Sequence, residues 1–346
     1  MSDTSIHHSA GPARHAGSPG TEHVGTGRTI AVLGATGQQG GSTAAALLAT
    51  GWTVRAVVRD PAADGARSLA AAGAEVVRGD LTEPESLRAA FTGVHGVFSV
   101  QPSSGQAGAG LSHDDEVRYG TAVAEAAQLS GVAHLVYSSM IAAGPKPTGV
   151  SHFDVKSRIE DRVRSVDTVS TIVRPATFME LLMTPGMGLD RGELTFLMRP
   201  DQAMQLIAVR DIGRVVAEVF GKPARFANRT IEIAGDALTG NAIAENLAQA
   251  AQRPIRYSRF SRAVLERDEV LARSAALVDD GRLAGVADLG ALRAMFPFLL
   301  SFDRWLKGPG EALLADALRP AHTSHHPLSR PHGVSERLAD RTRPRE

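Results

Sequence analysis

Glycines at positions 34, 37 and 40 separate a short apolar run, 30–33, from a helical pattern of small residues at 42–49. Gly34 can take a positive φ in a tight turn, Gly37 lets the backbone approach a phosphate, and Gly40 lets the helix pack close to the strand. Such turns also serve packing alone, but strand, glycine turn and helix in this order favour a site for a dinucleotide pyrophosphate at the helix N-terminus. We expect that site to be lined by Gly34, Thr36, Gly37, Gln38, Gln39 and Gly40.

The end of the second apolar run, 53–58, bears on the choice of cofactor. In dinucleotide-binding folds an acidic residue at this place accepts the ribose hydroxyls of NAD, whereas an arginine accommodates the 2′-phosphate of NADP. Arg59 stands there, Arg67 can add a second positive charge, and Asp60 argues mildly for NAD. The residues therefore favour NADP(H), the alternative being that Arg59 is simply a solvated surface charge.

His152 and Lys156 form a second group of residues that can do chemistry. They stand four positions apart in a predicted helix that begins near Ser151, so their side chains share one face. Ser151 is a candidate N-cap with Asp154 at the N3 position, which places His152 in the first turn. Because this helix follows the fifth predicted strand, we expect it to border the nicotinamide end of the cleft.

Four further segments can line the same cleft. Asp80 follows the third strand near the adenine edge, where it either accepts a hydrogen bond from the base or simply ends a turn. Gln101 ends the fourth strand, where the chain would pass the cofactor, and the Gly/Ser-rich residues 102–113 form either a lid or a plain connection. Apolar residues of the stretch 177–192 either line a pocket or form a flexible part of the core: Met179, Leu182, Met183 and Met187.

Six β-type runs alternate with helical patterns in the first half of the chain. Strands separated by helices form parallel βαβ units with right-handed crossovers. The alternation therefore predicts an α/β protein with a doubly wound, Rossmann-type parallel sheet and a ligand across the carboxyl ends of its strands. A capping box at Thr82–Glu85 predicts a helix to Phe91. The predicted strands are 29–33, 53–58, 74–78, 96–100, 134–138 and 170–174.

After Pro175 the strict alternation ends, which predicts a small C-terminal substrate lobe interleaved with the sheet. We assign 28–175 to the NADP-binding domain and 176–310 to the lobe, with 205–234 returning to the sheet. Residues 1–27 and 311–346 have little apolar content and no hydrophobic period, so we expect both to be disordered tails.

The composition of the 346-residue chain excludes several classes of function. Its 37 basic and 37 acidic residues cancel, which argues against direct contact with nucleic acid. The absence of cysteine excludes disulfides, thiolate nucleophiles and Cys-based metal sites. No run approaches the ~18 apolar residues of a membrane span, and the first residues lack the apolar region of a signal peptide. We expect a cytoplasmic protein with no metal and no membrane contact.

Seven short motifs follow one another along the chain: Gly34–Gly40, Arg59–Pro61, Gly79–Leu81, Val136–Ser139, His152–Lys156, Val173–Pro175 and Gln205–Gly213. This ordered set resembles the NmrA-like family of atypical short-chain dehydrogenases/reductases over about residues 28–260. The resemblance implies an NADP(H)-binding, doubly wound domain with a small C-terminal lobe. Ordinary short-chain dehydrogenases use a Tyr four residues before the Lys as the proton donor, and here that position is His152. Their Ser falls at Ser139 or Met140, and Tyr137 is expected inside a strand.

The missing Tyr leaves two functions open. In the first, the protein is an atypical NADPH-dependent reductase of a small carbonyl, enone or quinone compound. Lys156 then binds the nicotinamide ribose and favours a developing oxyanion, and His152, with an ordinary pKa of ~6.5, donates the proton. In the second, the protein is a redox sensor that binds NADP(H), catalyses little and acts through a regulatory partner or a homodimer. Lys156 is then only a ribose anchor, and His152 only a residue at the start of a helix.

Overall fold

A computed structural model describes residues 27–105 and 110–320 of the chain. Its centre is a seven-stranded sheet in which all neighbouring strands run parallel, in the order β10-β6-β5-β4-β1-β2-β3. The predicted Rossmann-type α/β fold is therefore confirmed. The strands of this sheet are β1 (Thr29–Val32), β2 (Thr53–Val58), β3 (Glu75–Arg78), β4 (Gly96–Ser99), β5 (His134–Ser138), β6 (Ser170–Pro175) and β10 (Arg229–Ile233).

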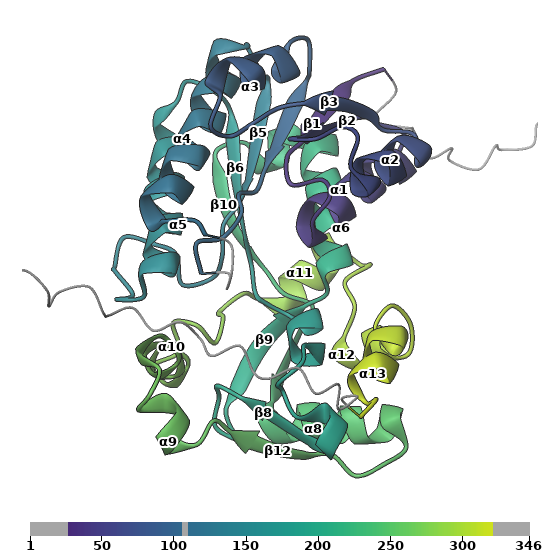
Figure 1. The fold of residues 1–346 in the computed structure, drawn as a ribbon, viewed down its shortest axis with the longest axis vertical. Helices are drawn as coiled ribbons and strands as arrows, with labels where there is room; N and C mark the ends of the chain where they lie inside the picture. The colour runs from purple at the N-terminus through teal and green to yellow at the C-terminus, as the bar shows by residue number, and fades with distance from the viewer. Residues whose placement is uncertain (1–26, 106–109, 321–346) are drawn as a thin grey trace, which may run out of the picture.

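Helices cover both faces of this sheet (Figure 1). Helices α3, α4 and α5 pack side by side on one face, and α1 packs along α6 on the other. These helices are α1 (Gln38–Ala49), α2 (Asp64–Ala71), α3 (Pro84–Phe91), α4 (His113–Leu129), α5 (Ser151–Ser165), α6 (Val209–Gly221) and α7 (Pro223–Phe226). Because both faces are covered, the central strands β4 and β5 are buried along their whole length.

The register of the sheet brings small residues to places where a helix approaches closely. Ile30 of β1 pairs with Val54 of β2 on one side and with Gly96 of β4 on the other. A Cβ on Gly96 would lie 2.6 Å from the ring of Phe220 in α6. Glycine at this position therefore lets α6 lie directly on the sheet.

A smaller lobe lies beyond one end of the large sheet (Figure 1). It contains a three-stranded sheet in the order β11-β9-β7 and a two-stranded sheet of β12 and β8. Its strands are β7 (Thr177–Phe178), β8 (Glu193–Phe196), β9 (Ala203–Ile207), β11 (Asp236–Thr239) and β12 (Arg256–Arg259). Its helices are η1 (Met179–Met183), η2 (Leu189–Arg191), α8 (Gly240–Ala251), α9 (Arg262–Leu265), α10 (Glu269–Asp279), α11 (Leu289–Met295), α12 (Phe302–Leu306) and α13 (Glu311–Ala317).

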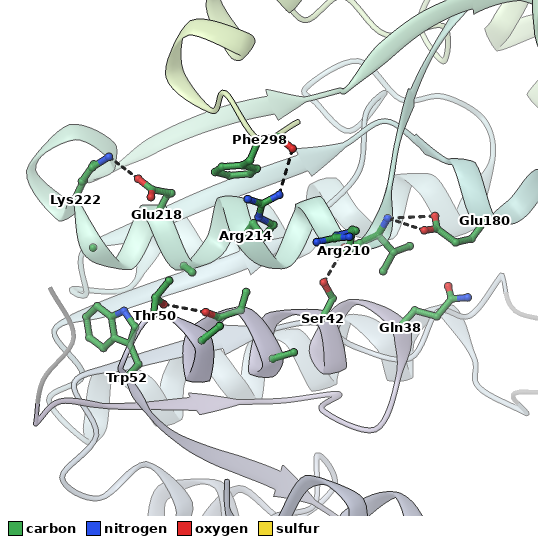
Figure 2. A pocket seen from close by; sticks show the side chains of 16 residues that line it. Gln38, Ser42, Thr50, Trp52, Glu180, Arg210, Arg214, Glu218, Lys222 and Phe298 are labelled. Atoms are coloured by element: carbon green, nitrogen blue, oxygen red, sulfur yellow. Dashed lines mark hydrogen bonds and ion pairs between the residues drawn. The ribbon is translucent and has the colours of Figure 1, made fainter. Parts of the chain in front are cut away.

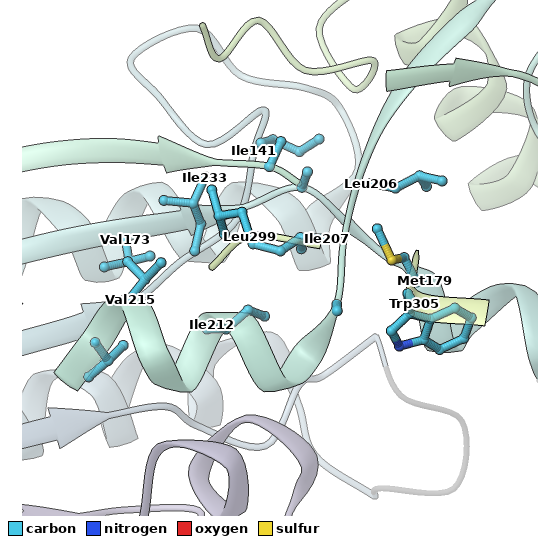
Figure 3. Packing of buried hydrophobic residues seen from close by; sticks show 14 of the residues in the cluster. Ile141, Val173, Met179, Leu206, Ile207, Ile212, Val215, Ile233, Leu299 and Trp305 are labelled. Atoms are coloured by element: carbon cyan, nitrogen blue, oxygen red, sulfur yellow. The ribbon is translucent and has the colours of Figure 1, made fainter. Parts of the chain in front are cut away.

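One hydrophobic cluster continues from the large sheet into this lobe (Figure 3). Val173 of β6 and Val215 of α6 belong to the same cluster as Met179 of η1 and Trp305 of α12, and all four are buried. The lobe is therefore packed onto the large sheet through a shared core. Of the segment 205–234, α6 and β10 join the layers of the large sheet, whereas β9 pairs only with β7 and β11.

Two local predictions are wrong. The capping box at Thr82–Glu85 does not form, because Glu83 is the N-cap of α3 without a side-chain bond and Thr82 Oγ1 donates instead to Asp80. The predicted tail 311–346 begins with a helix, α13, whose Leu314 is buried. Residues 1–26 and 321–346 of the predicted tails, and 106–109 of the predicted lid, lie outside the described residues.

Candidate functional site

The glycine turn after β1 brings the first turn of α1 against the end of the strand. Gly34 has φ +61°, in the left-handed region, and Gly37 N donates to Gly34 O at 2.8 Å. A Cβ on Gly40 would lie 2.2 Å from Gly34 O and 2.7 Å from Ala35 N. Only glycine at position 40 therefore allows α1 to start so close to the strand.

The N-terminus of α1 is suited to an anion. Its N-cap is Gly37, which provides no side-chain bond, and its first turn carries no acidic residue. The first backbone N–H groups of a helix have no intrahelical acceptor and carry the positive end of the dipole. Thr36, Gly37 and Gln38 are exposed, so a phosphate can reach them. A dinucleotide pyrophosphate therefore fits this turn, and a side chain at Gly40 would destroy the fit.

A second contact ties α1 to the middle of the sheet. Ser138, at the end of β5, donates from Oγ to Oε1 of Gln39 at 2.6 Å. This bond fixes Gln39, one of the predicted lining residues, against the carboxyl end of β5, which is separated from β1 by β4. The sequence analysis did not single out Ser138, although its place at a strand end was predicted.

The predicted 2′-phosphate and adenine residues lie at the ends of β2 and β3. Arg59 is exposed, and its charge contributes to lowering the pKa of Asp80. The main causes of that lowered pKa are hydrogen bonds from Thr82 N and Thr82 Oγ1, both to Asp80 Oδ1. Arg67 instead pairs with Asp64 on its own helix. Arg59 is thus placed to bind an anion at the surface. Asp80 accepts hydrogen bonds within a turn, which is the alternative that we gave to its binding of the adenine base.

Gln101 lies where the chain leaves β4, and its side chain is buried. Its Nε2 donates to Ser99 Oγ at 2.7 Å, whereas its Oε1 has no hydrogen-bond partner among residues 27–105 and 110–320. A buried amide oxygen without a partner is costly. A ligand group that donates to it would satisfy it, which keeps Gln101 in the candidate site.

Lys156 is buried, and its ammonium is already paired. Its ammonium forms an ion pair with Glu116 Oε1 of α4, whose side chain is fully buried. The other oxygen of Glu116 accepts a hydrogen bond from Ser104 N at 2.6 Å. Lys156 therefore does not stand alone as the predicted ribose ligand, because it shares a buried carboxylate with the segment that follows β4.

His152 lies one turn before Lys156 and is half-buried. A Cβ on Gly105 would lie 2.6 Å from its ring. Burial, followed by the nearby His113, lowers the pKa of His152 below its ordinary 6.5. The imidazole is therefore mostly neutral at pH 7, which makes it a weaker proton donor there than the ordinary pKa suggested.

The start of α5 differs in detail from the predicted cap. The helix begins at Ser151, so the N-cap is Val150 and carries no side-chain bond. Asp154 accepts from Thr148 N at 2.7 Å and from Gly149 N at 3.1 Å, so it closes the preceding turn instead of bonding to Ser151. The prediction of Ser151 as N-cap is wrong, while His152 does lie in the first turn.

Neither Tyr137 nor Ser139 offers a hydroxyl that is available for proton transfer. Tyr137 is fully buried within β5, as expected, and burial raises the pKa of its phenol well above the ordinary value. Ser139 donates from Oγ to Glu160 Oε1 at 2.6 Å. Glu160 is also bound by Arg174 and by Arg164. Ser139 is therefore part of a structural charge network.

A cavity of about 940 Å³ is lined by none of Arg59, Gln101 and Lys156 (Figure 2). It follows the outer side of α1 and α6, and Gln38 alone of the predicted site residues lines it. In Figure 2, Trp52 and Lys222 mark one end, and Gln38 and Glu180 mark the other. Three residues of the Met-rich stretch are instead buried in the core, namely Met179, Leu182 and Met183.

Glu116 is a candidate site residue that the sequence analysis missed. It stands in the acidic run 114–116, which resembles an ordinary acidic first turn of a helix. Its helical spacing to Gly120, Val123 and Ala127 places it on the buried face of α4. A charge on an apolar helical stripe was the available signal.

Residues 27–105 and 110–320 contain neither a membrane-spanning helix nor a cluster of metal ligands. No helix there is both long and apolar enough to cross a membrane. No group of three or more His, Cys, Asp or Glu side chains there is arranged to hold a metal ion.

Comparisons with known proteins place the chain among relatives. An NAD(P)H azoreductase from Xenophilus azovorans is 32% identical over 231 residues, which cover 66% of this chain and 76% of the relative. The structure of NmrA, a negative transcriptional regulator, in complex with NADP superposes with a TM-score of 0.66 at 22% identity, over 82% of this chain and 96% of that one. The NADPH-dependent quinone oxidoreductase of Escherichia coli superposes with a TM-score of 0.67 at 23% identity, over 80% and 98%.

At these identities the two solved structures establish the shared fold. The family assignment comes from the sequence itself, because the model of the NmrA-like family matches residues 26–282. That match covers most of the chain, including the glycine turn, His152 and Lys156. The protein therefore belongs to the NmrA-like family.

Proposed function

We propose that the protein binds NADP(H) across the carboxyl ends of its strands and reduces a small carbonyl, enone or quinone compound. The observation that carries the proposal is the first turn of α1, which has no side-chain cap and no acid and is pressed onto Gly34 through Gly40. Backbone N–H groups there would hold the pyrophosphate, and Arg59 would hold the 2′-phosphate.

The names of the relatives support a reductase. The azoreductase uses NAD(P)H, and the structurally similar quinone oxidoreductase depends on NADPH. Azo compounds and quinones are both conjugated electron acceptors, which agrees with the substrate class inferred from the sequence. A small-molecule substrate is therefore part of the proposal, while a homodimer or a regulatory protein partner stays a prediction.

The reduced cofactor would supply a hydride, and the chain's own residues would prepare the site. Lys156, held by Glu116, would bind the nicotinamide ribose and stabilise negative charge on the substrate oxygen. Gln101, where the chain leaves β4, offers a buried acceptor. His152 would donate a proton from its small imidazolium fraction, so its share of catalysis should grow as the pH falls.

The test is a fluorescence titration with NADPH and NADH, followed by NADPH oxidation over a panel of quinones, enones, aldehydes and azo dyes. We expect tighter binding of NADPH and turnover of at least one conjugated acceptor. A protein that binds neither cofactor would refute the proposal. Binding without turnover of any panel member, together with an NADPH-dependent change in oligomeric state, would replace it with the redox sensor.

A further inference from the structure

We infer that Glu116 is a positioning residue whose charge sets how tightly the protein holds NADP⁺ relative to NADPH. The inference rests on the proposed function and adds a role for a residue outside the glycine turn. Its basis is the buried contact between α4 and α5, in which one carboxylate oxygen binds Lys156 Nζ and the other accepts from Ser104 N.

The contact leaves Glu116 little freedom. Its side chain is fully buried, and that of Lys156 is only 10% exposed. Both carboxylate oxygens are in use, by groups 12 and 40 residues away along the chain. A buried charge stays charged only with a partner, so Glu116 and Lys156 hold each other at a fixed place.

Other charges nearby do not take over this role. Glu160 is the other buried acid of this region, one turn after Lys156 on α5, and it is occupied by Arg174 and Arg164. His152 faces the same region and is mostly neutral because burial lowers its pKa, and the nearby His113 is exposed. The local charge at the Lys156 ammonium is therefore balanced by Glu116.

This balance matters because the two cofactor forms differ in charge. When a hydride leaves the reduced ring, two electrons go to the substrate, which then takes up a proton, and the ring gains one positive charge. An uncompensated ammonium at Lys156 would repel that charge and would favour NADPH over NADP⁺. With Glu116 in place the pair is neutral overall, so the oxidised ring can form without that repulsion.

The experiment compares Glu116→Gln with Glu125→Gln by direct titration of NADPH and NADP⁺. Glu125 lies on the same helix and pairs with Arg162 of α5, so it is a matched contact between α4 and α5 at an exposed place. For Glu116→Gln we expect the ratio of the NADP⁺ to the NADPH dissociation constant to rise about ten-fold. For Glu125→Gln the ratio should not change.

A double variant, Glu116→Gln with Lys156→Met, removes both charges and keeps the inference testable if the single variant does not fold. Its ratio should return to the value of the unmodified protein, and Glu116→Asp should preserve that value. An unchanged ratio in folded Glu116→Gln, with both constants shifted equally or not at all, would overturn the inference and leave the proposed function standing. An unmodified protein that binds neither form would instead overturn the proposed function.

Discussion

At the proposed phosphate end of the site the contacts would be made by backbone, whereas at the proposed reaction end they would be made by charged side chains. Gly34, Gly37 and Gly40 bring the first turn of α1 to the strand end with no ionised group. Lys156 and Glu116 come from two helices and meet as a buried ion pair. The first arrangement depends on the absence of side chains at the glycines, and the second depends on the balance of two charges. The two ends should therefore respond differently to mutation and to pH.

The largest effect on cofactor binding should come from a single added carbon at the phosphate end. In Gly40→Ala the new Cβ would lie 2.2 Å from Gly34 O, so α1 must move and its N–H groups leave the anion. We expect NADPH affinity to fall on the order of 100-fold. Gly308→Ala, whose Cβ would meet nothing closer than 3.5 Å, is the control and should bind normally. Equal binding by both variants would show that the turn does not hold the cofactor.

At the reaction end, removal of one charge should cost stability. Lys156→Ala leaves Glu116 buried without its cation, which should lower the free energy of unfolding by about 3–5 kcal/mol. Arg162→Ala breaks the exposed pair with Glu125 and should cost less than about 1 kcal/mol. Denaturant unfolding of the two variants measures the contrast. Similar losses would mean that burial does not distinguish the two pairs.

A smaller effect should appear in cofactor choice. Arg59→Ala should weaken NADPH about ten-fold and NADH less than about two-fold, because only the former carries a 2′-phosphate. Arg67→Ala is the control, since Arg67 is paired with Asp64. Competition titrations give both constants. If Arg59→Ala weakened both cofactors alike, its predicted role would be lost.

The smallest effect should be a pH dependence confined to the reaction end. Burial lowers the pKa of His152, so its imidazolium fraction increases as the pH falls below 6.5. Turnover at saturating NADPH should rise about two- to five-fold from pH 8 to about pH 6, which is less than the rise of the imidazolium fraction because protonation would limit only part of the rate, and His152→Gln should flatten that profile. The NADPH affinity should depend on pH in the same way in the unmodified protein and in His152→Gln. A profile that His152→Gln leaves unchanged would assign the proton to another donor.

The same lowered pKa has a consequence for folding. Since the unfolded chain takes up the proton near the ordinary pKa, His152 favours the folded state above pH 6.5 and loses that contribution as the pH falls. His134, whose pKa burial lowers to about 4, acts in the same direction. Kinetic measurements at low pH therefore need a parallel measurement of unfolding.

The two ends also differed in how far the sequence predicted them. The turn at Gly34–Gly40 was predictable because its requirements are local. A Cβ on Gly37 or on Gly40 would crowd the backbone of Gly34. The partner of Lys156 was not, because Glu116 stands 40 residues earlier and meets it only once α4 packs on α5. Thr82 failed as a cap for a related reason, since Asp80 competes for its hydroxyl.

The order of the strands has a consequence for how the chain is made. Strand β6 pairs with β5 on one side and with β10 on the other, and the segment from β7 through α7 is synthesised between β6 and β10. Until Arg229–Ile233 has left the ribosome, β6 is an open edge with unpaired backbone groups. Mispairing at that edge is therefore a hazard specific to the interval in which the segment from β7 through α7 is made.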